Sequence, residues 1–373
     1  MIPETYMPSK EQIGSFTATL RRKLVENFLK DNMDPIKKFV DDHSWNKAKK
    51  ESDLICLESD LKYENFLLVV TSKALLWNVV KQERSHGESH FYTDATYKLL
   101  LNGFSVLTLG TENSNHNFRL IALAISAHEN TSSFNRFFSR VKVSLQSYFS
   151  FNWKPNFVVS DAADSILLAI EKVFPTAQHF RCFFHAVKAA REKTIRWKDK
   201  NEKETLKGNW GYINYVMKLL HRTCSIEEFR SLWDLASQDW KQKKLSDSFI
   251  KYFQKNFINN CQKQRWNRML KFGFNLTNNS IERFHCDIKD TFAERKKLKL
   301  TEFLLKLSKM VRDYSIDHSD EFCLEHNIPL NIWRHALHLL KEKSKGPFYD
   351  IREGMSLFIK KKRSLDLFES RKR

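Results

Sequence analysis

The chain has 373 residues, 42% of them hydrophobic, which is enough apolar material for more than one buried core. Its 63 Lys and Arg residues outnumber its 44 Asp and Glu residues, and the net charge of +19 predicts a polyanionic partner. No apolar run reaches the ~18–20 residues of a membrane span, and the six cysteines contain no CxxC pair. We therefore expect nucleic acid rather than a membrane as the partner, and we expect the cysteines to be reduced.

Residues 1–88 are predicted to be helical, because apolar residues recur at three- and four-residue spacing in segments 21–43 and 64–82. From residue 91 the period changes to that of strands. "FYTDATY", "GFSVLTLGTEN" and "NFRLIALAISAHEN" are separated by short, turn-rich breaks, which predicts a meander of three antiparallel strands. A helix over 131–150 should follow, capped by Thr131 or Ser132.

Strands and helices then alternate. "NFVVSD" predicts a buried strand, "ADSILLAIEKVF" a helix, "AQHFRCFF" a strand and "HAVKAAREKTIRW" a helix. The order βββαβαβα predicts an α/β fold in which helices cover a mixed sheet. Residues 195–265 are rich in Lys, Trp and Glu and predict an all-helical insertion, after which a long helix starting near Asn278 returns the chain to the core.

These patterns divide the chain into five regions. We expect a helical N-terminal region, the first part of the α/β core, the helical insertion, the return to the core, and a helical, basic C-terminal region, over residues 1–88, 89–194, 195–265, 266–300 and 301–373. The last region contains the basic cluster Lys360–Arg363, a candidate nuclear import signal or phosphate contact whose simpler alternative is a solvated chain end.

Three acidic residues stand where a metal site can form. Asp94 interrupts the first strand of the meander, and Asp161 ends a buried strand directly before a helix, where ligand sites gather in such sheets. Glu282 falls in the first turn of the returning helix, beside its apolar face. Carboxylates brought together repel one another unless a cation lies between them, and Mg²⁺ prefers such oxygen ligands.

Each acidic residue also has a simpler explanation. Asp94 can be a hydrogen-bonded core residue, Asp161 can cap the next helix, and Glu282 can stabilise a helix N-terminus by ~0.3–1 kcal/mol. Spacing alone does not select these three from the 44 acidic residues. The nearest competitors are Glu112, Asp164, Asp287 and Asp290.

The motifs around these residues resemble the transposase domain of Mutator-like elements (MULE). "FYTDATYKLL", "FVVSDAADSILLAIEKVFPTAQHFRCFFHAVKAA" and "RWNRMLKFGFNLTNNSIERFH" carry the resemblance, which covers about residues 88–300. The middle block is the most specific part, because it joins an Asp, a Phe-Pro and a Cys-x-x-His at fixed offsets. The resemblance implies an RNase H-like fold and a DDE catalytic and metal-binding triad of Asp94, Asp161 and Glu282.

The same resemblance implies a chemistry for the triad. Transposases of this type cleave DNA and join a 3′-hydroxyl to target DNA, using two Mg²⁺ or Mn²⁺ ions. Asp94 would bridge both ions, while Asp161 and Glu282 would each hold one. The alternative is a catalytically silent, host-adopted protein that binds DNA through the same fold. Another RNase H-like nuclease is disfavoured by the insertion and the Cys-x-x-His.

Four further residues are candidates for DNA binding or for support of the site. Cys182 and His185 form the Cys-x-x-His pair, which is only half of a structural zinc site, so zinc is not expected unless a neighbour such as His179, His285 or Cys286 completes it. A buried Cys182 and a DNA-contacting or triad-ordering His185 are the alternatives. Arg265 and Trp266 suggest a phosphate contact and base stacking, with a packing anchor as the favoured alternative for the Trp.

The chain departs from the family in one respect. Full-length relatives often carry an N-terminal zinc-binding DNA-recognition domain and a C-terminal Cys/His finger, and only an isolated "CLEH" is present here. Recognition of element ends would then fall to the helical N-terminal region or be missing. By analogy, paired element ends imply at least a homodimer, acting on transposon ends and target DNA in the nucleus.

Overall fold

The computed structural model describes residues 9–113, 117–161, 163–259, 265–267, 277–316, 348–351 and 355–358. Two compact units make up the chain, Met1–Leu324 and Glu325–Arg373. In the second unit, strands β8 (Phe348–Ile351) and β9 (Met355–Phe358) pair antiparallel. The expectation that residues 301–373 are helical is therefore wrong for these two strands, and most of that range lies outside the described residues.

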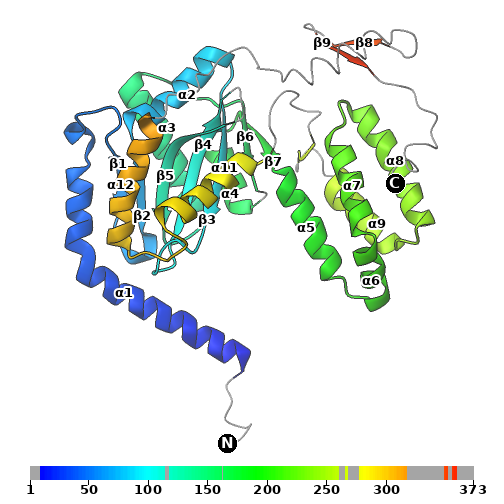
Figure 1. Ribbon diagram of the computed structural model, residues 1–373, viewed down its shortest axis with the longest axis horizontal. Coiled ribbons are helices and arrows are strands. Elements are labelled where there is room, and N and C mark those ends of the chain that lie inside the picture. The colour runs from blue at the N-terminus through cyan, green and yellow to red at the C-terminus, as the bar shows by residue number, and fades with distance from the viewer. Residues whose placement is uncertain are drawn as a thin grey trace, which may run out of the picture. The chain divides into compact units, whose positions relative to one another are not determined.

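A seven-stranded mixed sheet forms the centre of the first unit (Figure 1). Its strands lie in the order β1-β2-β5-β4-β3-β6-β7. The first four pairings along this order are antiparallel, whereas β3 pairs parallel to β6, and β6 pairs parallel to β7. The strands span Ile55–Asp60, Leu67–Thr71, His90–Thr96, Ser105–Glu112, Phe118–Ser126, Phe157–Ser160 and Gln178–Arg181, numbered β1 to β7.

Helices alternate with the later strands. From β3 onward the order is β3, β4, β5, α3, β6, α4, β7, α5, which agrees with the predicted βββαβαβα. The cap of α3 is Asn130, one residue before the predicted cap, and its side chain accepts a hydrogen bond from the Ser133 backbone N–H. The first five α-helices span Lys10–Asp42, Lys73–His86, Thr131–Phe149, Asp164–Val173 and Phe183–Ile195, numbered α1 to α5.

Two strands lie where only helices are predicted. Residues 55–60 and 67–71 form β1 and β2, which extend the sheet from β5, so the helical prediction for residues 1–88 is wrong there. The reason is the run Leu67–Val70, whose four side chains are completely buried. A short continuous apolar run fits a strand covered on both faces as well as a buried helix, and periodicity does not separate the two.

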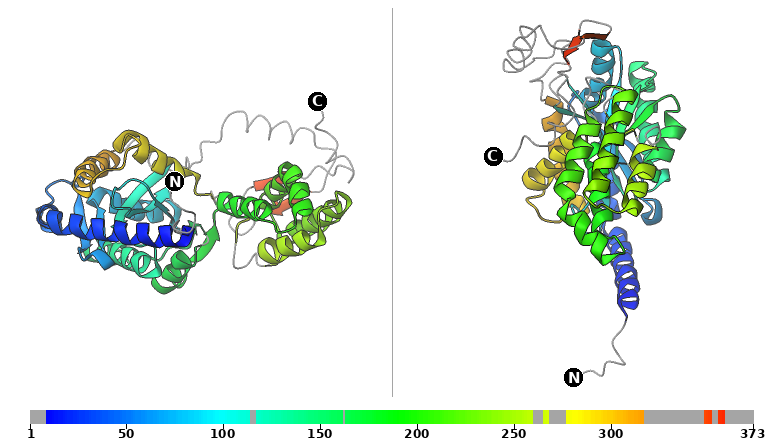
Figure 2. Two further views of the ribbon diagram at one scale, coloured as in Figure 1. Left: turned by 90° about the horizontal axis from the view of Figure 1, so that it is seen from below. Right: turned by 90° about the vertical axis from the view of Figure 1, so that its right-hand side faces the viewer.

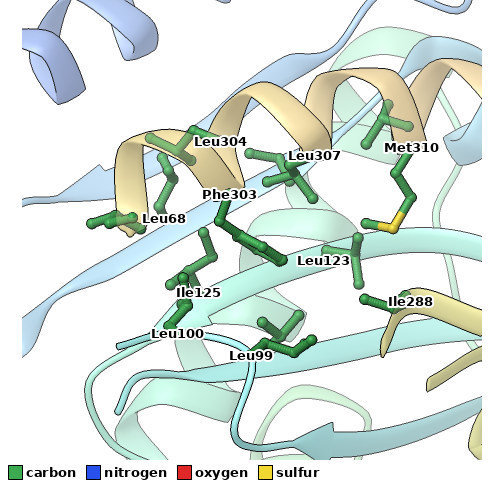
Figure 3. Close-up of a cluster of buried hydrophobic side chains, with 14 of the residues drawn as sticks. Leu68, Leu99, Leu100, Leu123, Ile125, Ile288, Phe303, Leu304, Leu307 and Met310 are labelled. Carbon is green, nitrogen blue, oxygen red and sulfur yellow. The ribbon is translucent and has the colours of Figure 1, made fainter. Parts of the chain in front are cut away.

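Helices cover both faces of the sheet (Figure 2). The alternation of side chains along each strand divides the core: Leu68 and Ile125 face α12, whereas Leu67 and Ala124 face α3 and α4. Helix α12 (Leu300–Ile316) packs Phe303, Leu304, Leu307 and Met310 across the first face, as Figure 3 shows.

Among the residues that the structure describes, no helix is long and apolar enough to cross a membrane.

A separate apolar cluster builds the helical insertion. Its aromatic residues Trp233, Trp240 and Phe253 pack together on α8 and α9. A π-helical segment, Gln254–Ile258, ends this region. The helices span Lys200–Gly208, Trp210–His221, Ile226–Gln242 and Asp247–Phe253, numbered α6 to α9.

Helix α11 (Asn279–Asp287) returns the chain to the sheet and is extended by a π-helical segment, Ile288–Phe292. Gly110 of β4 makes room for this return. A Cβ at Gly110 would collide with the Phe118 ring, and that ring packs on Phe284 of α11 with centroids 4.8 Å apart. The bare backbone at Gly110 therefore lets an aromatic pair dock α11 on the sheet.

Candidate active site at the end of β3 and β6

Asp94 of β3 and Asp161, the residue directly after β6, lie level with each other. In the parallel pairing of β3 with β6, Tyr92 is opposite Val159, so two residues further along the register brings Asp94 level with Asp161. Tyr92 and Val159 belong to one apolar cluster, which means that they lie on the same face of the sheet. Because side chains alternate along strands, both aspartates project from that face.

Asn278 places the third carboxylate. This residue caps α11, and its carbonyl accepts the hydrogen bond from the Glu282 N–H at 2.8 Å, which closes the first helical turn. Its side-chain amide donates to the Thr93 carbonyl at 3.4 Å, and its backbone N–H donates to the Cys182 sulfur at 3.2 Å. Asn278 thus ties the start of α11 to β3 and to the end of β7, and Glu282 follows one turn later.

Asp94 is largely buried and lies within the electrostatic reach of the other two carboxylates. Burial raises the pKa of the Asp94 carboxyl to about 7, the Ala95 N–H opposes this shift, and the charges of Asp161 and Glu282 add to it. Burial also raises the pKa of Glu282, while the nearby Lys188 ammonium lowers it. Segments far apart in the sequence therefore bring three acidic side chains into one neighbourhood.

Two histidines line this group of acids. The Nδ1 atom of His285 lies 3.8 Å from Oδ2 of Asp94, and its Nε2 atom lies 2.9 Å from the Thr108 hydroxyl. Burial lowers the pKa of His285 to about 3, so its imidazole is neutral at physiological pH. The Nε2 atom of His185 lies 3.9 Å from Oε1 of Glu282.

Cys182 is a buried residue whose sulfur fixes the backbone of Asn278. Burial raises the pKa of its thiol to about 11, which keeps the sulfur protonated. Two of the histidines that could complete a zinc site have other partners. The Nε2 atom of His179 forms a hydrogen bond with the Ser160 hydroxyl at 2.7 Å, and that of His285 forms one with the Thr108 hydroxyl. The geometry therefore favours support of the site by Cys182.

Arg265 and Trp266 are adjacent in the sequence but have different surroundings in the structure. Trp266 is completely buried, and its indole N–H donates to the Phe257 carbonyl at 2.9 Å. The prediction that Trp266 stacks on a DNA base is therefore wrong, and Trp266 is instead a packing anchor. The Arg265 charge contributes to lowering the pKa of His179 to about 4, behind the larger effect of burial, so it lies near β7. A phosphate contact by Arg265 stays a prediction.

Glu112 is a buried carboxylate with a different task. Its oxygens accept hydrogen bonds from the Tyr92 phenol at 3.1 Å and from the Ser280 hydroxyl. Ser280 lies in the first turn of α11, two residues before Glu282. Glu112 thus joins β3, β4 and α11 beside the three acids, and it holds the turn that carries Glu282.

Replacing Glu112 with Ala should destabilise the protein by about 1–3 kcal/mol per donor left without an acceptor, and should also reduce any activity that needs Glu282. Urea unfolding of Glu112→Ala, Ser280→Ala and the double mutant gives the coupling free energy between the two side chains. Glu112→Gln is the control, because its amide oxygen still accepts one bond. Additive effects of Glu112→Ala and Ser280→Ala would contradict the link between β4 and α11.

The sequence does not predict two residues as neighbours of Asp94, although it offers one of them, His285, as a possible zinc ligand. Glu129, in the loop before α3, adds to the raised pKa of Asp94 and accepts a hydrogen bond from Tyr97, but no local pattern marks it. His285 follows Glu282 by three residues, so the two share one side of the helix. That spacing is a signal that could have found His285.

The acidic group offers oxygen donors to a hard divalent cation. Repulsion from Asp161 and Glu282 on Asp94 is what such a cation would relieve. Within the described ranges, no three His, Cys, Asp or Glu side chains lie close enough together to hold one ion. The arrangement therefore fits an ion that takes one or two protein carboxylates and leaves its other positions to water and substrate phosphate, as Mg²⁺ does.

Comparison with known proteins agrees with the resemblance seen in the motifs. Residues 90–189 match the family model of the MULE transposase domain. That stretch contains Asp94, Asp161, Cys182 and His185, and it ends before Glu282. No curated protein has a sequence that matches the chain. Over residues 90–189 the chain is similar to the MULE transposase domain, which confirms the resemblance to Mutator-like transposases.

Proposed function

We propose that this chain is a DDE-type DNA transposase of the Mutator-like class, with an RNase H-like catalytic core built from β3 to α5 and α11. The observation that carries the proposal is the convergence of Asp94, Asp161 and Glu282: the β3–β6 register sets the two aspartates level, Asn278 ties the start of α11 to β3, and the charges of Asp161 and Glu282 add to the effect of burial on the pKa of Asp94. The match of residues 90–189 supports it independently. Support for Glu282 comes from its place one turn beyond Asn278.

Each acid takes a distinct role in this proposal. Asp94, on which the charges of both other acids act, would be shared by two metal ions, while Asp161 and Glu282 would each hold one of them. Two bound Mg²⁺ or Mn²⁺ ions would supply activation of the attacking oxygen and stabilisation of the leaving oxygen.

The remaining residues shape the site. His285 contacts Asp94 and bonds Thr108, so it limits the rotation of that carboxylate. Cys182 and Glu112 hold the two sides of the first turn of α11. The net charge of +19 favours binding of DNA with strong salt dependence, because basic contacts release counterions from phosphates. We place this activity in the nucleus, with a homodimer or higher oligomer joining paired transposon ends to target DNA.

The test is metal-dependent cleavage of DNA that flanks the gene on either side, since such DNA contains the ends of an element that encodes the protein. Strand cuts should appear with Mg²⁺ or Mn²⁺ and should be missing with EDTA. A second arm measures DNA binding in EDTA. Binding without cleavage in either metal would overturn the enzyme proposal and leave the host-adopted DNA-binding protein.

A further inference from the structure

Helix α5 presents one exposed row of side chains that the proposed catalysis does not use. Phe184, Lys188 and Arg191 are exposed and follow one another at spacings of four and three residues, so they lie on one side of the helix. We name these three residues the α5 row. The Phe184 ring is 49% exposed, whereas Cys182 and Ala186 next to it are buried.

The α5 row begins beside the acidic group. Phe184 precedes His185, and their rings contact each other with centroids 6.0 Å apart. His185 in turn lies 3.9 Å from Glu282. The charge of Lys188 acts on the pKa of both Glu282 and His185, which places its ammonium close to the same site. The row therefore runs from the acids along α5 toward the helical insertion.

Other charged residues of α5 have partners within the protein. Glu192 pairs with Arg196 at 3.6 Å, and the Lys193 ammonium lies over the rings of Trp197 and Tyr252. Lys188 and Arg191 are exposed on the side of the helix that carries Phe184, and the Lys188 charge also acts on Glu282. Two cations and an aromatic ring on one exposed track are the side chains that bind a nucleic-acid strand without sequence preference.

We propose that the α5 row binds the DNA strand that leads away from the cleaved phosphate, with Lys188 and Arg191 on phosphates and Phe184 stacked on an unpaired base. This inference rests on the proposed function and names a surface for its substrate. It gives a role to the exposed Phe184 ring, which lies beside His185 and so near Glu282.

Phosphate contacts are tested with the double variant Lys188→Ala/Arg191→Ala. Its binding to fluorescein-labelled duplex and single-stranded oligonucleotides of arbitrary sequence is followed by anisotropy in EDTA over a salt series. We expect the slope of log K against log salt to fall by about 1 for each cation removed. The matched control is Lys218→Ala/Arg222→Ala, which removes one exposed cation on α7 and one directly after its last residue. An equal loss of slope in both double variants would overturn the α5 row as a specific track.

Stacking is tested with Phe184→Ala on single-stranded DNA that carries 2-aminopurine. We expect the wild-type protein to quench the probe and the variant to restore its fluorescence, with affinity reduced about fivefold or more. Tyr215→Ala, which removes a ring 42% exposed on α7, is the control. Unchanged quenching in Phe184→Ala would remove the stacking contact.

These outcomes are separate from those of the catalytic proposal. Binding is measured in EDTA, so the α5 row can be established in a protein that never cuts DNA. Conversely, intact metal-dependent cleavage together with unchanged binding by all α5 variants would refute the row alone. Circular dichroism of each variant checks that it folds.

Discussion

Replacing Asp94 with Asn is expected to abolish metal-dependent DNA cleavage and, at the same time, to stabilise the metal-free protein. Bound metal contributes several kcal/mol to stabilisation of the transition state, so the rate should fall by about a thousandfold or more. The gain in stability has a separate cause. Asp94 is held in a buried position beside Asp161 and Glu282, where a charged carboxylate is unfavourable.

The pH dependence of this gain follows from the raised pKa. The pKa of the Asp94 carboxyl is 3.8 in the unfolded chain and rises to about 7 in the folded protein. Between these values the folded state binds a proton that the unfolded state does not, so the free energy of unfolding decreases as pH rises. At 1.36 kcal/mol per pKa unit, the penalty above about pH 7 reaches at most about 4 kcal/mol. Asn carries no charge and removes it.

Urea unfolding in EDTA at several pH values measures the effect. The Asp94→Asn variant should gain most above neutral pH and almost nothing below about pH 4. Mg²⁺ should raise the stability of the wild-type protein and not that of the variant. Asp164→Asn is the control, because Asp164 is an exposed acid three residues beyond Asp161. Full cleavage activity in Asp94→Asn, or equal stabilisation by Mg²⁺, would refute a metal ligand at this position.

The alternating strands and helices after residue 90 are predictable from the sequence because each element has a clean period and a turn at its end. The apolar run before Asp161 requires a buried strand, and "ADSILLAIEKVF" requires a helix directly after it. Those two facts place Asp161 at the end of β6, between strand and helix. The run Leu67–Val70 lacks such a period, and β2 was missed for that reason.

The candidate site was predictable only as a set of positions. The sequence marks Asp94, Asp161 and Glu282 through their local contexts, but the bond from Asn278 to Cys182 joins residues 96 apart in the chain. From the sequence, Glu112 is a competitor for the metal site. Its hydrogen bonds to Tyr92 and Ser280 show that it has a structural role. Partners that lie across a sheet leave no periodic signal, and they decide which acid is structural.

Trp266 is another residue whose surroundings the sequence does not reveal. An Arg-Trp pair before a core return suggests a DNA contact, whereas the structure encloses the indole between Phe183 and Phe229. Both ends of this residue are also tied: its N–H donates to Phe257, and its carbonyl accepts from His221 Nδ1 at 2.7 Å. Trp266 thus anchors the returning chain to the helical insertion.

Replacing Trp266 with Ala is therefore expected to lower the free energy of unfolding by about 3–5 kcal/mol, the usual cost of deleting a fully buried aromatic side chain. Trp266→Phe keeps most of the volume and loses the bond to Phe257, so its cost should be nearer 0.5–1.5 kcal/mol for the hydrogen bond, as a rough figure. Chemical denaturation measures both. Trp210→Ala, at a half-buried position in the same cluster, should cost less than Trp266→Ala.

DNA affinity separates packing from recognition at this position. If Trp266 is a packing anchor, Trp266→Phe should bind single-stranded DNA as the wild-type protein does, because no face of the ring is open to a base. Wild-type stability combined with a selective loss of single-strand affinity in Trp266→Ala would contradict the packing role. In that case the indole would have to leave its enclosure to reach DNA, which would require breaking the bond to Phe257 and opening the cluster around Phe183 and Phe229.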